Sequence, residues 1–292
     1  TPKGSTYFSP KKMGALEVTS KGDLLLYIIM NIPMYIALAV LTWKLSAKMN
    51  WIDELVAYGV YATLAVLYIF QVWKIIQVNK PIFETEVPEI QRYAFKQIAI
   101  LDLAYMLTFG AELAVVSMLP LYYVDTFNVE PIMAGILAGI YPVINLFARP
   151  AGGWLSDKIG RKLTLGIVTS GATFSFFLLS MVTTDWALWM VVATTILAGI
   201  FSKAGSGAVY AMVPLIQRRM TGQFAGMVGA FGNVGGLAFL TVFSFVSTDI
   251  FFMTIAGTAA FVFLMVIIFL NEPSGHMVEV LEDGTVEMIE VK

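Results

Sequence analysis

Eight long runs of apolar residues alternate with short polar stretches along the chain. They cover residues 24–43, 55–73, 98–124, 132–155, 163–182, 186–216, 224–246 and 250–270. A helix needs about 20 apolar residues to cross a bilayer core, and each run is close to or above that length. Because lipid offers no hydrogen-bond partner to a free backbone amide, such runs must be helical. The pattern predicts an all-α polytopic membrane protein with about eight transmembrane helices.

Polar segments divide these runs into two units. A linker at 75–97, with two prolines and mixed charge, separates a two-helix unit at 24–74 from a six-helix unit at 98–271. Residues 1–23 are polar and lack the apolar region and cleavage site of a secretory signal, so we interpret them as a cytoplasmic loop. This interpretation leads us to expect that the chain is a fragment of a longer protein.

The segment 272–292 is acidic, and we place it in the cytoplasm as a tail. Within it, Asp283 and Gly284 lie between loosely alternating apolar residues, a pattern that suits a β-hairpin. The acidic composition suits a disordered tail equally well. The sequence leaves both structures open.

Basic residues lie almost entirely on one side of the predicted membrane. If the amino end faces the cytoplasm, only Lys44 and Lys48 face outward. The cytoplasmic side then holds Lys3, Lys11, Lys12, Lys21, Lys74, Lys80, Arg92, Lys96, Lys158, Arg161, Lys162, Arg218, Arg219 and Lys292. Cytoplasmic loops carry the excess of lysine and arginine in membrane proteins. We therefore predict a multi-pass protein of the cytoplasmic membrane with both chain ends in the cytoplasm.

Composition supports a membrane protein and excludes several kinds of site. The chain is 58% hydrophobic and 13% charged, with a mean hydropathy of +0.79, whereas about a quarter of the residues of a soluble domain are charged. It has no cysteine and one histidine, His276, so a thiolate or zinc site is not expected. It also has no Gly-x-Ser-x-Gly elbow and no phosphate-binding loop. We expect no enzymatic activity, no cofactor and no nucleic-acid partner.

The stretch ARPAGGWLSDKIGRK, residues 148–162, joins two predicted spans. Gly153 allows close helix packing, Asp157 can cap the next helix and Gly160 supplies a sharp turn. Arg161 and Lys162 would hold the loop in the cytoplasm. From the residues alone, a well-formed turn with cations that reach the interface explains this stretch.

The stretch GQFAGMVGAFGNVGGLAF, residues 222–239, places one amide, Asn233, on a glycine-rich helix. Each glycine in a helix interior costs about 1 kcal/mol relative to alanine, so close approach to the backbone is the expected purpose. At about 100° per residue, Asn233 lies on the same stripe as Gly229. Small-residue seams between membrane helices have the same spacing. The alternatives are therefore packing, or an approach of Asn233 and backbone at Gly229, Gly232, Gly235 and Gly236 to a small substrate.

Arg149 lies within a predicted span, eight residues before Asp157. A charge inside the bilayer is costly unless it is paired or faces a cavity, so a functional role is the natural hypothesis. An extended side chain that reaches water is the alternative. The guanidinium offers paired donors in a plane, which suits a flat oxyanion. Pro150 is expected to bend the helix at this point.

Tyr105, Phe109 and Glu112 recur at intervals of four and three residues, which places them on one helical stripe. Packing or contact with an anion through ring edges and the hydroxyl both fit the two aromatic residues. Glu112 falls near the middle of its span, where it is either a proton carrier or a structural partner of Lys203 or another polar group. We expect Lys203 and Asp102 to reach toward the interface.

The motif G-x-x-S-D-K-x-G-R-K at 153–162 resembles the signature loop of the major facilitator superfamily, which follows the second helix of each six-helix half. Here it follows the second span of the six-helix unit. The stretch RRMTGQFAGMVGAFGNVGG resembles the glycine- and asparagine-rich signature of the nitrate/nitrite porter family on the fifth helix of each half. TPKGS at the start is similar to the loop after the first six helices in that family. The two additional spans are similar to those of its cyanobacterial-type branch.

This resemblance implies a carboxy-terminal part of a nitrate/nitrite permease without its first six helices. It implies an anion-binding role for Arg149, Tyr105, Phe109 and Asn233, and a role in conformational change for the signature loop. It also implies nitrate and nitrite as substrates and the missing amino-terminal half as a partner.

Transport by alternating access is the expected mechanism. Moving one anion into a cell that is negative inside costs about 2.3 kcal/mol per 100 mV, so uptake needs a second anion leaving or more than one proton entering. Nitrate/nitrite exchange and proton symport both stay open. A transporter of another small anion, or a non-transporting membrane receptor or scaffold, is the alternative function.

Overall fold

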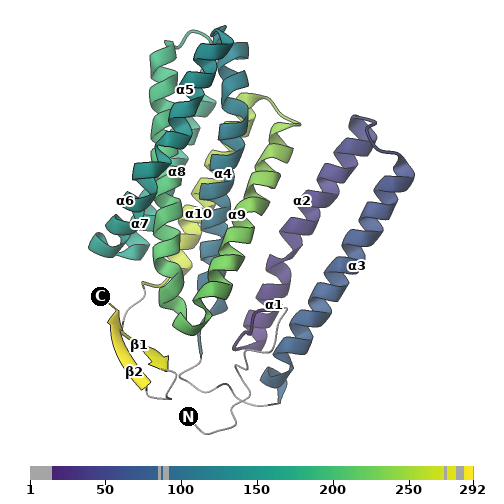
Figure 1. Ribbon diagram of the computed structural model, residues 1–292, viewed down its shortest axis with the longest axis vertical. Helices are drawn as coiled ribbons and strands as arrows, with labels where there is room; N and C mark the ends of the chain where they lie inside the picture. The colour runs from purple at the N-terminus through teal and green to yellow at the C-terminus, as the bar shows by residue number, and fades with distance from the viewer. Residues whose placement is uncertain (1–14, 85–86, 88–91, 273–274, 281–285, 292) are drawn as a thin grey trace.

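Long helices that run side by side form the protein in its computed structural model (Figure 1). The structure describes residues 15–84, 87, 92–272, 275–280 and 286–291. The helices are α1 Lys21–Met30, α2 Ile32–Trp43, α3 Glu54–Asn79, α4 Phe95–Phe127, α5 Pro131–Val143, α6 Asn145–Ile159, α7 Arg161–Ser180, α8 Leu188–Ile216, α9 Thr221–Phe243 and α10 Thr248–Phe269. A π-helical turn, Lys44–Lys48, extends α2, and 3-10 turns at Lys80–Phe83 and Arg218–Met220 follow α3 and precede α9.

Eight of these helical stretches are long and apolar enough to cross a membrane. The predicted number of spans and the helical membrane fold are therefore confirmed in the part of the chain that the structure describes. Local sequence signals set several helix ends. The Ser20 hydroxyl caps α1 by accepting from the Asp23 N–H, the Glu130 carboxylate caps α5, and Asn128 ends α4 with a φ of 51°.

Two spans are each divided into two helices. The first span consists of α1 and α2, which meet at Asn31, and the fourth consists of α5 and α6, which meet at Ile144. The interruption of the fourth span follows Pro142, and α6 continues as a helix through Pro150, where the sequence predicted a bend.

Glycines bring two pairs of helices into backbone contact. Between α4 and α9, a Cβ on Gly235 would lie 2.1 Å from the Met106 carbonyl oxygen. Between α6 and α8, a Cβ on Gly207 would lie 1.9 Å from the Arg149 carbonyl oxygen. No side chain fits at such distances, and close backbone packing stabilises helix pairs in lipid. The glycines therefore fix where α4 and α6 present their side chains.

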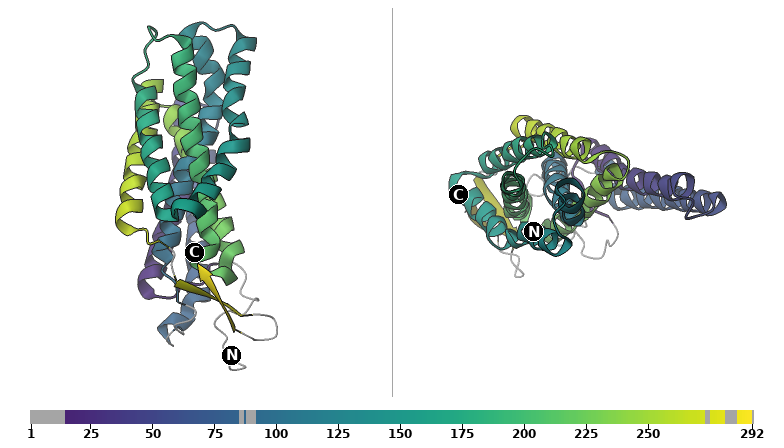
Figure 2. Two further views of the ribbon diagram at one scale, coloured as in Figure 1. Left: turned by 90° about the vertical axis from the view of Figure 1, so that its left-hand side faces the viewer. Right: turned by 90° about the horizontal axis from the view of Figure 1, so that it is seen from above.

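The two-helix unit, α1 to α3, stands beside α9 and projects from the six-helix unit (Figures 1 and 2). At one end of the bundle, Thr19 Oγ1 donates to the carbonyl of Tyr93, just before α4 (2.7 Å), and the Tyr93 hydroxyl donates to the Glu17 carbonyl (2.6 Å). At the other end of the bundle, Lys44 Nζ donates to the Ser244 carbonyl (3.1 Å). The unit is thus tied down at both ends of its helices.

The start of α1 and the two strands that follow α10 lie at the same end of the bundle (Figure 1). The turns at this end carry Lys80, Arg92, Arg161, Lys162 and Arg218, so we call it the basic end. The strands β1 Gly275–Val280 and β2 Val286–Val291 pair antiparallel here. For these residues the structure has the hairpin rather than the disordered tail. Asp283 and Gly284, which suggested the turn, lie outside the described residues.

Candidate functional site

Arg149 lies among three aromatic rings from two helices. Its guanidinium carbon is 5.8 Å from the ring centre of Tyr105 and 5.9 Å from that of Phe109, both on α4. The ring centre of Tyr210 on α8 is 5.6 Å away. Arg149 Nη2 donates to the Tyr105 hydroxyl at 2.7 Å. No carboxylate of the described residues pairs with this half-buried guanidinium, so its positive charge stays available to an anion.

The local fold holds the α4 rings in place. Tyr105 and Phe109 are one helical turn apart, and their rings stack at 5.1 Å with an interplanar angle of 7°. On α9, a Cβ on Gly232 would lie 2.6 Å from the Tyr105 ring and 2.7 Å from the Phe109 ring. Glycine at this position therefore lets both rings approach the backbone of α9. The structure brings together Arg149, Tyr105 and Phe109, the residues for which the family resemblance implies contact with an anion.

Tyr210 belongs to the same cluster, although the sequence did not single it out. Its ring meets that of Tyr105 edge-on, with centres 5.0 Å apart and an angle of 81°. Its hydroxyl donates to the carbonyl of Ala225 on α9 at 3.2 Å. A Cβ on Gly229 would lie 3.1 Å from that hydroxyl. The available signal was a tyrosine in the small-residue stretch KAGSGAVY, seven residues after Lys203 and so on the same helical face.

Lys203 is paired with Glu112 deep in the bundle. Lys203 Nζ lies 2.8 Å from Glu112 Oε1, and Asn145 Nδ2 donates to the same oxygen at 3.3 Å. The ammonium also lies 4.5 Å from the ring centre of Tyr141. Lys203 is 0% exposed, so the expectation that it reaches the interface is corrected. Of the two alternatives for Glu112, the structure supports the partner of Lys203.

Asn233 does not reach the cluster of Arg149. Its side chain is exposed, and its Nδ2 donates to the Gly229 carbonyl of its own helix at 3.1 Å. Gly222 and Gly226 on the same stripe have nothing within 4 Å of a Cβ. This stripe of α9 is therefore open.

The other glycines of α9 face α4. A Cβ on Gly236 would lie 2.8 Å from the Leu113 side chain, and Gly235 meets Met106 as described above. Packing, one of the two alternatives for the glycine-rich helix, explains Gly232, Gly235 and Gly236. Of the glycines predicted to approach a substrate, only Gly229 borders the open stripe.

Asp102 is also placed differently from the expectation. It is 0% exposed rather than at the interface. Helices α1, α5, α8, α9 and α10 all contact α4, which explains its burial. Among the described residues, no group of three or more aspartates, glutamates or histidines is arranged to hold a metal ion.

Comparison with known families gives a match to the Major Facilitator Superfamily over residues 101–289. This range covers most of the six-helix unit and the signature loop. The chain belongs to the major facilitator superfamily.

The sequence of this superfamily member is similar to those of three named transport proteins. It is 38% identical to a nitrate/nitrite transporter, NrtP, of Nostoc punctiforme over 97% of this chain, and 38% identical to an NrtP of a Picosynechococcus species over 99%. It is 29% identical to a nitrite extrusion protein of Bacillus subtilis over 66% of this chain and 46% of that relative. The chain spans 57% of the length of each of the first two.

The superfamily signature loop is held by a carboxylate that the sequence did not single out. Glu272, just after α10, accepts from the N–H groups of Arg161 and Lys162 at 2.7 Å each. Asp157 was expected to cap α7, and this is corrected: it forms an ion pair with Arg161 at 3.2 Å instead. Gly160 has a φ of 104°, which turns the chain between α6 and α7 and aims the first amides of α7 at Glu272.

Gly153 of the same motif faces α8, where a Cβ would lie 3.6 Å from the Gly207 carbonyl oxygen. The same helix, α6, therefore carries Arg149, forms the contact with α8 and leads into the signature loop.

Proposed function

We propose that this chain is part of a transporter that carries nitrate and nitrite across the cytoplasmic membrane by alternating access. Arg149 carries the proposal. It is a cation inside a span that has a hydroxyl and three ring faces as neighbours but no carboxylate among the described residues. A charge in that position is costly without a counterion, and an anionic substrate supplies one. The names of the similar proteins supply the identity of the anion.

The roles of the neighbours follow from their contacts with Arg149. Tyr105 orients the guanidinium through its hydroxyl. The stacked rings of Tyr105 and Phe109 form a wall against which a flat anion lies, with their positive edges available to its oxygens. Lys203 adds no net charge here because Glu112 neutralises it. One uncompensated positive charge matches a monovalent anion.

A second six-helix half would complete the site. Asn233 is exposed on α9 and Arg149 is half-buried on α6. Polar side chains in lipid are costly, so a face that carries them is better covered by protein or by a water-filled path. The chain spans 57% of its two similar transporters, which leaves room in them for such a half. In the complete protein, Asn233 and the backbone at Gly229 would then approach the substrate from the open stripe of α9.

The proposed orientation places the basic end in the cytoplasm. The lysines and arginines of the turns at this end are the reason. During the transport cycle, α4 and α9 would move together as one rigid pair, because glycines hold their backbones in contact. The signature loop with Gly153, Asp157, Gly160, Arg161 and Lys162 would limit how far α6 and α7 separate. The coupling mode is nitrate/nitrite exchange or proton symport.

Nitrate uptake into proteoliposomes that contain the full-length protein tests the proposal. One set has nitrite inside and no gradient, and the other has an imposed proton gradient and no nitrite. We expect uptake in at least one set. Uptake driven by internal nitrite indicates exchange, and uptake driven only by the gradient indicates symport. Absence of nitrate flux in both sets contradicts the substrate, and competition by other small anions then identifies a different cargo.

The variant Arg149→Lys separates transport from the alternative of a receptor or scaffold. Lysine keeps the charge but loses the planar paired donors. For a transporter we expect nitrate flux to fall at least about tenfold, because a hydrogen bond to a charged group contributes about 1.5–3 kcal/mol. A protein that binds nitrate without moving it, with or without this change, contradicts transport.

A further inference from the structure

Asp102 is a buried carboxyl group that the proposed anion site does not use. Its side chain on α4 is 0% exposed, and neither of its oxygens has a hydrogen-bond partner among the residues that the structure describes. Glu112 on the same helix, by contrast, has the Lys203 ammonium at 2.8 Å. Of these two buried carboxyl groups, only Glu112 has a cation that compensates its negative charge.

The helices packed against α4 bring no cation to Asp102 within the described part of the chain. These helices are α1, α5, α8, α9 and α10, and α6 also reaches α4 through the bond from Arg149 to the Tyr105 hydroxyl. Helix α9 has no titratable residue. Those of the other five are Lys21, Asp23 and Tyr27 on α1, Tyr141 on α5, Arg149, Asp157 and Lys158 on α6, Lys203 and Tyr210 on α8, and Asp249 on α10.

Each cation and acid in that set is occupied or distant. Lys203 is engaged by Glu112, and Lys21 lies over the ring of Phe83 at 5.5 Å. On α6, Arg149 donates to the Tyr105 hydroxyl, and Lys158 lies over the ring of Trp154 at 5.5 Å. Asp249 begins α10 at the end of the bundle opposite the basic end. On α4 itself, Lys96 is exposed and interacts with Asp23 rather than with Asp102. The ionised form of Asp102 would be an uncompensated charge in apolar surroundings, so the form that carries a proton is favoured.

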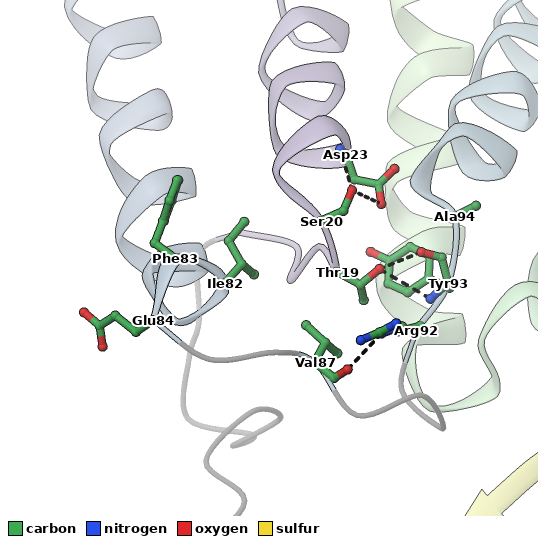
Figure 3. Close-up of a pocket in the computed structure, with 10 residues that line it drawn as sticks. All are labelled: Thr19, Ser20, Asp23, Ile82, Phe83, Glu84, Val87, Arg92, Tyr93 and Ala94. Carbon is green, nitrogen blue, oxygen red and sulfur yellow. Dashed lines mark hydrogen bonds between the residues drawn. The ribbon is translucent and has the colours of Figure 1, made fainter.

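Asp102 lies between the anion site and a pocket at the basic end. Tyr105 follows it by three residues, or about 4.5 Å along the helix, on neighbouring positions of one side. Toward the basic end, its electrostatic neighbour is Tyr27 on α1, four residues after Asp23. Asp23 lines a pocket of about 690 Å³ between the start of α1, the turn after α3 and the linker (Figure 3). Asp23 and Tyr27 thus lie one helical turn apart on α1, between this pocket and Asp102.

We propose that Asp102 binds a proton that is coupled to anion transport. This inference rests on the proposed transport function and specifies its coupling ion. Asp102 holds a proton while the anion is bound at Arg149. When water enters from the pocket at Asp23, the carboxyl group loses its proton to that water and becomes a carboxylate. The new negative charge, one turn from Tyr105, weakens the hold of Arg149 on the anion, so proton and anion leave on the same side.

The test compares two modes of transport in proteoliposomes with the full-length protein. Counterflow, the exchange of labelled for unlabelled nitrate, needs no net proton movement, whereas accumulation driven by a proton gradient does. Asp102→Asn keeps the size of the side chain and removes the titrating group. We expect counterflow within about twofold of the unmodified protein and gradient-driven accumulation reduced at least about tenfold. Asp102→Glu should restore accumulation with a shifted pH dependence.

Asp249→Asn is the matched control, since it makes the same chemical change at an exposed carboxylate at the far end of the bundle. It should leave both modes unchanged. Infrared difference spectra between low and high pH give a readout apart from flux. Exposed carboxyl groups that titrate give a carbonyl band in all three proteins. A further carbonyl component at the higher frequency of a carboxyl group without a hydrogen bond should be present in the unmodified protein and in the control, and absent in Asp102→Asn.

Three results overturn the inference. Full accumulation by Asp102→Asn shows that this carboxyl group carries no coupled proton, and loss of both modes shows a structural or positioning role instead. Exchange without any gradient-driven accumulation in the unmodified protein removes the coupled proton but leaves anion transport intact. If the unmodified protein moves nitrate in neither mode, the proposed function itself fails.

Discussion

Arg149 and Lys203 are both basic residues inside membrane spans, yet their surroundings are opposite. Lys203 is fully buried with the Glu112 carboxylate at 2.8 Å, whereas Arg149 is half-buried and meets a hydroxyl and ring faces. A cation with its own carboxylate has no net charge to offer to a ligand. A cation held by neutral groups keeps its charge. The comparison teaches that the partner of an intramembrane charge, rather than its position in the span, decides whether that charge stays available to a ligand.

Removing the carboxylate of Glu112 should have the largest effect on stability. Glu112→Gln leaves the Lys203 ammonium buried without a counterion, which costs on the order of 3–5 kcal/mol in the free energy of unfolding. Thermal unfolding of the purified protein in detergent measures the loss. The double variant Glu112→Gln with Lys203→Met should regain most of it, because no charge is then left unpaired.

The matched change at the other cation is Arg149→Met. We expect it to leave the free energy of unfolding within about 1 kcal/mol of the original, since no partner charge is orphaned. Equal destabilisation by Arg149→Met and Glu112→Gln would show that the two cations are equivalent and that the comparison fails.

The second prediction concerns the contact that positions Arg149. A Cβ on Gly207 would lie 1.9 Å from the Arg149 carbonyl oxygen, so Gly207→Ala must push α6 away from α8. Overpacking of this kind costs about 1–3 kcal/mol and should also weaken nitrate binding. Gly226→Ala is the control, because its Cβ would meet nothing within 4 Å. It should stabilise the protein slightly, by up to about 1 kcal/mol, as alanine favours helix. If both variants behave alike in unfolding and binding, the α6–α8 contact does not position Arg149.

The sequence predicted the helical architecture for clear physical reasons, and it singled out three residues of the candidate site, whose role there is implied by the family resemblance. Long apolar runs must be helices in lipid, so the spans followed from composition. The spacing of Tyr105 and Phe109 placed both rings on one face, and a single intramembrane guanidinium marked Arg149. These features are local in sequence, and one helix is enough to define them.

Features that depend on contacts between helices were not predicted. Tyr210 joins the site because α8 packs against α6, and Asp102 is buried because five helices pack around α4. Glu272 replaces Asp157 as the cap of α7 because α10 ends beside the start of α7. Each of these pairings joins positions far apart in sequence, and the spacing of residues along one helix carries no information about them.

The third prediction isolates the hydroxyl that contacts Arg149. Tyr105→Phe keeps the ring and its stacking on Phe109 but removes the acceptor 2.7 Å from Arg149 Nη2. We expect nitrate affinity to fall about tenfold, or about 1.4 kcal/mol, with little change in unfolding temperature. Equilibrium binding of labelled nitrate measures the change. Tyr122→Phe, on the same helix, is the control and should bind nitrate normally. Unchanged affinity in Tyr105→Phe would show that the hydroxyl does not contribute to nitrate binding.

The smallest effect is expected at Glu272, a carboxylate compensated by backbone amides rather than by a side-chain cation. It accepts from the N–H groups of Arg161 and Lys162 at the start of α7, where the helix dipole also favours negative charge. Glu272→Gln should cost about 1 kcal/mol in the free energy of unfolding.

The matched change is Asp157→Asn, which removes an ion pair whose carboxylate side chain is 60% exposed. Exposed pairs contribute about 0–1 kcal/mol and are screened by salt, so the loss should be smaller than for Glu272→Gln and should vanish at high ionic strength. Thermal unfolding of both variants at low and high salt compares the two carboxylates. A larger loss for Asp157→Asn would show that Asp157, as the sequence predicted, caps α7. The conclusion that the partner of a charge determines its role, drawn from Arg149 and Lys203, would then not apply to charges compensated by backbone amides.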